Sequence, residues 1–232
     1  MTLSDTASPD SPDPVTPTRR PWWVIALALL GVAGLAFAIG RFSMFGNSGP
    51  LPPGETSAEV GFSRDMQVHH AQAVEMAMEI YRKTEDPEVR VLSYDIATGQ
   101  SAQRGEMFDW LVQWGVPQGG GEMMAWMSAS EAGHDHGVPA DAAPLAQDEA
   151  MELMGMASGA ELEELRAAEG RAADCLFLEL MIRHHEGALP MADALLELGS
   201  EPRALQLAAT IRAGQSAELD AMASLQQRLG CD

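Results

Sequence analysis

One segment of this chain occurs twice, at an offset of 115 residues. The two copies share four residues with soft or nitrogen donors at unchanged spacing: Met66, His69, His70 and Met76 in the first copy, and Met181, His184, His185 and Met191 in the second. The tetrapeptide Gly-Gln-Ser-Ala also occurs in both copies, at residues 99–102 and 214–217. Because a stacked array needs about three repeats or more, the sequence predicts two copies of one supersecondary unit.

The first copy carries the signals of a helical hairpin. Thr56 and Glu59 form a capping pattern, which predicts a helix that ends near Lys83. Pro87 fits the first turn of a second helix, and Gly115 is typical of the residue that ends one. Helices of this length therefore account for the whole first copy.

The second copy repeats this layout, with expected helices at residues 171–198 and 202–230. No segment alternates polar and apolar residues with the period of two that is typical of a strand. We therefore expect an all-α fold, an antiparallel four-helix bundle made of two duplicated helical hairpins. The bundle domain should span residues 57–231, with a flexible crossover at 116–157.

An uncharged stretch near the N-terminus predicts a membrane anchor. Nineteen residues from Trp22 to Gly40 hold no charge, close to the roughly 20 apolar residues that cross a bilayer as a helix. Two arginines precede the stretch and one follows it closely, which places the N-terminus in the cytoplasm and the later domain outside. The alternative is a signal peptide that is cleaved, with secretion of the domain. The expected segments are a disordered cytoplasmic tail at 1–20, a transmembrane helix at 21–42 and a linker at 43–56.

The charge of the chain excludes one class of function. The formal net charge is −20, and the first 45 residues contribute nothing to it because they hold three aspartates and three arginines. The exported part is therefore strongly acidic, repels nucleic acid and attracts cations. Acidic helix faces are common on solvated surfaces, so the charge permits a metal-binding function without establishing one.

The chain has two cysteines, Cys175 and Cys231. In an oxidising compartment such a pair forms a disulfide more often than it stays as two thiols. Both residues fall at the same end of the second expected hairpin, although Cys231 lies about two helical turns further from the turn at Gly199. A bend of the chain past Gly230 would let the disulfide form.

The repeated residues share one sector of each expected helix, because successive residues rotate by about 100°. Di-iron bundles use a Glu-x-x-His motif, whereas this chain has Met66-x-x-His69 and Met181-x-x-His184. A neutral thioether thus replaces a hard carboxylate. Thioether and imidazole donors favour Cu(I), and by the same softness Ag(I), over iron, magnesium or manganese. The eight repeated residues are therefore the expected metal ligands.

Further methionines and histidines are weaker candidates. Met107 and Met222 also match between the copies, but methionine commonly fills helical cores, and they are distant in sequence from any histidine. The crossover holds Met123, Met127, His134 and His136, which either capture copper transiently or belong to a polar linker. Both interpretations stay open for these six residues.

The sequence around the paired histidines resembles the bacterial family called domain of unknown function 305. The similarity runs from about Ser57 to Cys231 and is most specific over residues 62–77 and 177–192. This family includes CopM-like periplasmic copper-binding proteins with a ferritin-like helical fold. The resemblance implies a ferritin-like bundle, copper binding through Met and His, and a role in copper or silver resistance. It implies the same eight ligands: Met66, His69, His70, Met76, Met181, His184, His185 and Met191.

One residue departs from an ideal second copy. Pro190 directly precedes Met191, where its ring removes a helical hydrogen bond and clashes with the carbonyl of Glu186. The first copy has Glu75 at the matching position. The sequence thus predicts that Met191 can be displaced from its spacing.

The leading hypothesis is a membrane-anchored, extracytoplasmic protein that binds Cu(I), and Ag(I) as a second ion, to sequester or relay metal without catalysis. One alternative is a ferritin-like metalloenzyme, such as a metal oxidase, which needs hard ligands and open coordination positions. The other is a structural or sensory helical ectodomain whose methionines only pack. A homo-oligomer is compatible with the sequence, and no donor or acceptor protein is identified by it.

Overall fold

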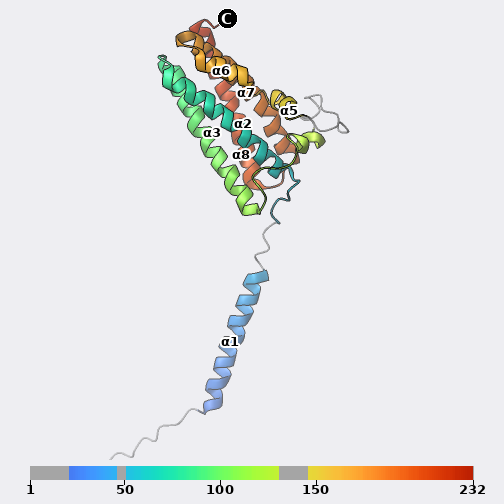
Figure 1. Cartoon of the computed structure of the whole chain (residues 1–232). Coiled ribbons are helices and arrows are strands. Elements are labelled where there is room, and N and C mark those ends of the chain that lie inside the picture. Colours follow the sequence, from blue (N-terminus) through green and yellow to red (C-terminus); the bar gives the residue numbers. More distant parts are fainter. Residues whose placement is uncertain (1–20, 46–50, 131–145, 232) are drawn as a thin grey trace, which may run out of the picture. The chain divides into compact units, whose positions relative to one another are not determined.

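The computed structural model describes residues 21–45, 51–130 and 146–231. The elements are all helical: α1 (Trp22–Phe45), α2 (Ala58–Lys83), α3 (Pro87–Trp114), the 3-10 helix η1 (Ala125–Ala129), α5 (Gln147–Leu153), α6 (Gly159–Ala167), α7 (Gly170–Leu198) and α8 (Pro202–Leu229) (Figure 1). No strand occurs in these three ranges. The all-α prediction is therefore confirmed, and residues 1–20, predicted as a disordered tail, lie outside the described residues.

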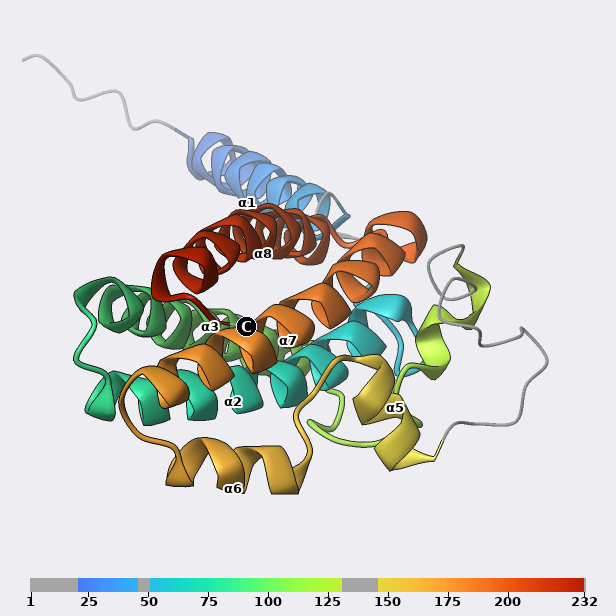
Figure 2. The same ribbon diagram turned by 90° about the horizontal axis from the view of Figure 1, so that it is seen from above.

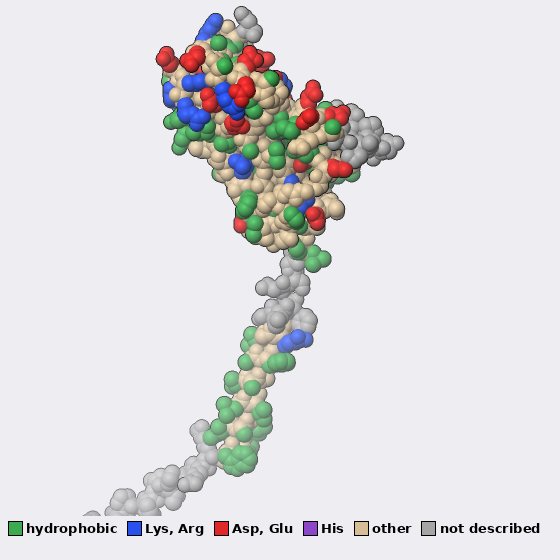
Figure 3. All heavy atoms as spheres, in the orientation of Figure 1, with side chains coloured by type: hydrophobic (Ala, Val, Ile, Leu, Met, Phe, Trp, Pro, Cys, Tyr) green, Lys and Arg blue, Asp and Glu red, His purple; other side chains and the backbone are tan. Residues whose placement is uncertain are grey.

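Helix α1 belongs to a compact unit of its own, residues 1–51. Its segment Trp22–Arg41 has a mean hydropathy of 2.3 and is long and apolar enough to cross a membrane. Hydrophobic side chains cover the described part of this helix, whereas acidic and basic side chains gather on the other unit (Figure 3). The predicted apolar helix exists, and it ends at Phe45 rather than at residue 42. Membrane insertion stays a prediction.

The first hairpin consists of α2 and α3, which pack against each other. The side chain of Ser57 caps α2 by accepting a hydrogen bond from the Val60 amide at 3.3 Å, so the cap lies one residue after the predicted Thr56. Asp86 caps α3 through the amides of two following residues, and the left-handed Gly115 ends it. These local signals explain why both helices form where the sequence predicted them.

The second hairpin consists of α7 and α8. Glu201 caps α8, Pro202 occupies its first turn and Gly230 ends it with a φ of 65°. Helix α7 continues past Pro190 to Leu198, and Met191 stays fully buried. Pro190 therefore lies inside a helix that tertiary packing holds together, and it does not remove Met191 from the core.

The two hairpins meet along α2 and α7, with α3 packed on α2 and α8 packed on α7 (Figure 2). Glu59, near the start of α2, accepts hydrogen bonds from the amides of Ser200 and Glu201 after the end of α7, at 2.6 and 3.0 Å. At the other end of the hairpins, Arg228 forms an ion pair with Asp86 at 2.8 Å. These contacts show that α2 and α7 run in opposite directions. Helix α3 also approaches α8 along a short seam.

The crossover between the hairpins is folded where the structure describes it. Asp65 on α2 accepts hydrogen bonds from the amide of Met124 and the indole of Trp126, at 2.8 and 2.9 Å, which holds η1 against α2. The side-chain amide of Gln72 exchanges two hydrogen bonds with the backbone of Ala157, at 2.6 and 2.9 Å. The described ends of the predicted crossover are thus tied to α2.

The crossover also touches α7 closely. A Cβ atom placed on Gly187 would lie 1.9 Å from the carbonyl oxygen of Met154. Gly155, with a φ of +69°, makes a similarly close approach to the Arg183 carbonyl. Glycine at position 187 is therefore required for the crossover to lie directly on α7.

Gly187→Ala should lower the free energy of unfolding by about 1–3 kcal/mol, because the added methyl group overlaps the Met154 carbonyl. Gly105→Ala on α3 is the matched control, since no atom lies within 4 Å of its Cβ position. The control should be stabilising by about 0.5–1 kcal/mol through helix propensity. Urea denaturation measures both, and equal effects would contradict the close approach.

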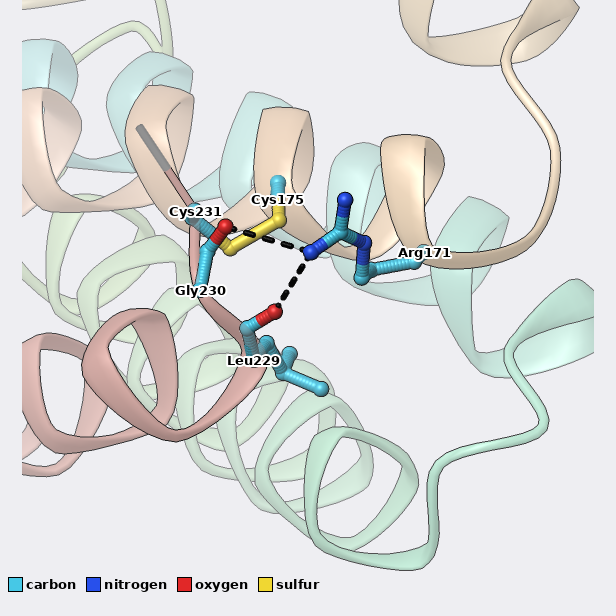
Figure 4. The surroundings of a disulfide bond; sticks show 5 residues. All are labelled: Arg171, Cys175, Leu229, Gly230 and Cys231. Atoms are coloured by element: carbon cyan, nitrogen blue, oxygen red, sulfur yellow. Dashed lines mark hydrogen bonds between the residues drawn. A yellow bond between two sulfur atoms is a disulfide. The ribbon is translucent and has the colours of Figure 1, made fainter.

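A disulfide joins Cys175 at the start of α7 to Cys231 after α8, with a Cα–Cα distance of 5.4 Å (Figure 4). Gly230 turns the chain at this point, and Arg171 donates hydrogen bonds to the carbonyls of Leu229 and Gly230 at 2.9 and 3.2 Å. This bend absorbs the two-turn difference expected from the sequence. The bond therefore joins the beginning of the second hairpin in the chain to its end.

Replacing both cysteines by serine should lower the free energy of unfolding by about 2–4 kcal/mol, because the cross-link restricts the unfolded chain. Urea denaturation of the variant and of wild type with reductant should give matching losses. A thiol assay on unreduced wild type should find no free thiol, and detection of two would contradict the bond.

Candidate metal centre

Two histidines from the two motif copies stack where α2 meets α7. The ring centroids of His69 and His184 are 3.7 Å apart, and both side chains are fully buried. The Nε2 atom of His69 lies 3.0 Å from the carbonyl oxygen of Met154, and that of His184 lies 3.1 Å from the carbonyl oxygen of His69. Since a carbonyl oxygen only accepts, each Nε2 donates and carries the proton. The other ring nitrogen, Nδ1, then holds a lone pair.

His70 and His185, the second histidine of each motif, also donate a hydrogen bond from Nε2, in their case to side chains. His70 Nε2 lies 2.7 Å from Gln103 Oε1, and His185 Nε2 lies 2.6 Å from Glu218 Oε2. Gln103 and Glu218 match each other in the repeat. An amide oxygen or a carboxylate accepts a hydrogen bond, so Nε2 is the donor in both contacts.

All four Nδ1 atoms are buried and have no hydrogen-bond partner among the described residues. Buried polar atoms are nearly always paired, so four such orphans in one repeated motif need an explanation. A metal ion accepts lone pairs of this kind, whereas packing alone leaves them unsatisfied. The histidines thus fit a metal by the chemistry of the donor atoms they leave open.

Burial keeps the imidazoles of His69, His70 and His184 neutral. It lowers the pKa of His69 to about 4 and that of His70 to about 3, with the neighbouring histidines adding to the effect. Burial likewise lowers the pKa of His184 well below its ordinary value. Neutral imidazole is the form that binds metal, so proton competition is weak at neutral pH.

Methionines gather in two buried clusters, each of which combines both copies. One hydrophobic cluster contains Met66, Met191 and Met107. The other contains Met181, Met76 and Met222. Because α2 and α7 are antiparallel, the first methionine of one motif joins the second methionine of the other. Each cluster therefore contains one methionine from the start of a motif and one from the end of the other motif.

Met107 and Met222 are fully buried in the same clusters as the motif methionines. Their separation in sequence is therefore no sign of separation in space. In the crossover, Met127 is buried in the first cluster and Met123 packs against it. The predicted accessory residues His134 and His136 lie outside the described residues.

Hard donors are scarce at the centre. Within the described ranges, no three His, Cys, Asp or Glu side chains come together as a metal site. Asp65, the carboxylate nearest the first motif, is occupied by its contacts with η1, and burial raises its pKa. A site at these helices therefore needs sulfur as well as nitrogen donors.

Three contributors to the centre escaped the sequence interpretation: the Met154 carbonyl, Gln103 and Glu218. Comparison of the copies at an offset of 115 residues would have marked Gln103 and Glu218 as a matched pair on the second helices. The Met154 carbonyl has no sequence signal, because any residue supplies a carbonyl.

The family model called domain of unknown function DUF305 matches residues 59–226. The chain belongs to the DUF305 family. No curated protein matches it. The segment of the chain that matches the DUF305 model includes all eight motif residues.

Solved structures of the DUF305 family share the fold. A protein from Streptomyces coelicolor, named as secreted, is 35% identical, with 77% of this chain and 96% of that chain covered and a TM-score of 0.66. A fragment from Deinococcus radiodurans is 31% identical over 74% and 96%, with a TM-score of 0.59. CopM in its Cu(I)-bound form is 26% identical over 74% and 96%, with a TM-score of 0.52. CopM is also solved in Cu(II)-bound and Ag-bound forms.

Acid should destabilise the metal-free protein. Below the ordinary pKa of 6.5 a histidine gains a proton in the unfolded chain, whereas His69 resists it in the fold until about pH 4. Stability is thus full above about pH 6.5 and falls as the pH decreases, by about 2 kcal/mol from His69 alone by pH 5. Urea denaturation at pH 7.5 and pH 5 measures this.

The ion-paired carboxylates lose their contribution to stability at a lower pH than the histidines do. The loss due to the histidines can therefore be measured separately. The pKa values of Asp86 and Glu161 are lowered to about 2, chiefly by hydrogen bonds from Arg228 and Arg183. Their stabilisation is lost only as the pH falls below about 4. A midpoint that is constant from pH 7.5 to pH 5 would contradict the buried neutral histidines.

Proposed function

We propose that this DUF305 protein binds Cu(I), and Ag(I) as a second ion, outside the cytoplasm and without catalysis. One observation carries the proposal: four buried imidazoles leave their Nδ1 atoms unpaired, and the motif methionines are all buried in the two hydrophobic clusters of the same domain. This donor set is soft and neutral, which favours Cu(I) over harder ions.

The proposed ligands are the repeated residues. They comprise Met66, His69, His70, Met76, Met181, His184, His185 and Met191, with Met107 and Met222 as further sulfur donors. The Cu(I)-, Cu(II)- and Ag-bound forms of CopM, a protein of similar fold, support copper and silver as the metals. Since each methionine cluster draws on both copies, the proposed sites are composite and require the α2–α7 contact.

The biological role that fits this arrangement is sequestration or relay of copper at a membrane surface. Helix α1 has the length and composition of an anchor, and the cytoplasmic N-terminus follows from the flanking arginines. The acidic domain would concentrate cations around a neutral centre. We further propose that the two hairpins form a duplicated, ferritin-like four-helix bundle, in which α2 and α7 carry equivalent ligands.

Cu(I) titration in competition with a chromophoric chelator tests the ligands. Replacing His69, His70, His184 and His185 by alanine should lower the affinity by more than about 100-fold, since loss of merely supporting residues costs 10- to 100-fold. Met→Leu at the four motif methionines conserves volume and should weaken binding with little loss of fold. X-ray absorption of the wild type should report both sulfur and nitrogen neighbours.

Met78→Leu is the matched control, because Met78 lies on α2 outside the motif and only packs against the second cluster. It should bind Cu(I) as tightly as wild type. Unchanged affinity in the four-histidine variant would overturn the ligand assignment. Oxygen consumption on addition of Cu(I) or Fe(II) would instead support a metal oxidase.

A further inference from the structure

The repeated tetrapeptide Gly-Gln-Ser-Ala has no part in the proposed ligand set, yet the structure brings its two copies together. Residues 99–102 lie on α3 and residues 214–217 on α8, and both helices contribute to one small cavity. The cavity has a volume of about 50 Å³ and is lined by Gly99, Gln100, Gly214 and Gln215 among others. A motif that is conserved between the copies therefore builds a common polar space at the α3–α8 seam.

The two glutamines leave their polar atoms unpaired. Gln100 and Gln215 are only 4% and 3% exposed, and neither the oxygen nor the nitrogen of either amide has a partner among the described residues. Buried amides without partners are strongly disfavoured. Since one water needs only about 10–15 Å³ of such volume, the cavity has room for water or a hydrated ion to satisfy them.

The same cavity reaches the partners of the outer histidines. Gln103 and Glu218 line it, and they accept hydrogen bonds from His70 and His185. A single side chain, Gln103 or Glu218, therefore separates the cavity from the imidazole of His70 or His185. Among its lining residues, Asp95 and Glu218 carry carboxylates, so a cation is favoured there over an anion.

The outer edge of the cavity lacks side-chain cover. Gly99 and Gly214 are exposed, and a Cβ atom on either would have no neighbour within 4 Å. On the opposite side the crossover closes the centre, because Met154 lies on Gly187 and on His69. The histidines themselves have no exposed surface. The seam is thus bordered by residues without side chains, whereas Met154 covers His69 and Gly187 directly.

We propose that the α3–α8 seam is the port through which a copper ion reaches the buried histidines, with Glu218 as the charged group beside His185. The glycines keep the port open, and the glutamines hold water in it. This inference rests on the proposed function, because it names the route to that same centre.

Closing the port tests it. The Gly99→Leu/Gly214→Leu variant places two side chains at the exposed edge of the cavity, where the wild type has none. The high helix propensity of leucine should preserve the fold. Stopped-flow mixing with Cu(I) delivered from a weak chelator should show loading slowed by roughly tenfold or more, since binding would then require a conformational change. Final stoichiometry and affinity should equal those of the wild type.

Gly105→Leu is the matched control, since Gly105 is an exposed α3 glycine with open space at its Cβ position that does not line the cavity. It should load at the wild-type rate. A second variant, Gln100→Leu/Gln215→Leu, replaces the unpaired amides by apolar groups of similar size. It should raise the denaturation midpoint while it slows loading, a combination that a merely structural role would not produce.

The outcomes separate the two proposals. If wild type binds no Cu(I), the proposed function fails. If wild type binds Cu(I) and the double-glycine variant loads at the same rate, the port is wrong while the ligand assignment stands. Equal slowing in the Gly105→Leu control would also overturn the port.

Discussion

The stacked pair of neutral imidazoles between α2 and α7 is the contact on which the rest of the domain depends. Rings buried in this way cannot be charged, and their N–H groups need acceptors. His184 finds one in the backbone of α2, which fixes the approach of the two helices. His69 finds one in the crossover, which must therefore lie directly on α7 and needs a glycine there. The need of the buried N–H groups for acceptors thus determines how α2 and α7 pack, where the crossover runs and which ring nitrogens stay unpaired.

The antiparallel contact also determines how the repeat is used. Two identical motifs on parallel helices would bring equivalent methionines together, the first with the first and the second with the second. Here each cluster takes one methionine from the start of a motif and one from the end of the other. The copies are nevertheless not equivalent, since His70 faces the neutral Gln103 and His185 faces the charged Glu218.

Local chemistry made much of the fold predictable. Caps and stops such as Asp86, Pro87 and Gly115 act on their own neighbours, so the sequence located both hairpins within a residue or two. Local rules failed where distant contacts prevailed. Pro190 disfavours a helix, yet α7 passes through it because its buried face packs on α2 and α8. The crossover contains glycine and proline, but Asp65 and Gln72 secure its described ends.

The sequence by itself determined the helical class, the apolar N-terminal helix, and the types and spacing of the donor residues, because periodicity, caps and side-chain chemistry are local properties. Only the tertiary structure decided which donors share a cluster, which ring nitrogen is unprotonated and where a polar cavity opens. These depend on atoms from residues that are distant in sequence, such as His69 and the Met154 carbonyl, which are 85 positions apart. A backbone carbonyl has no residue type, so no sequence pattern could have shown that it fixes the tautomer of His69.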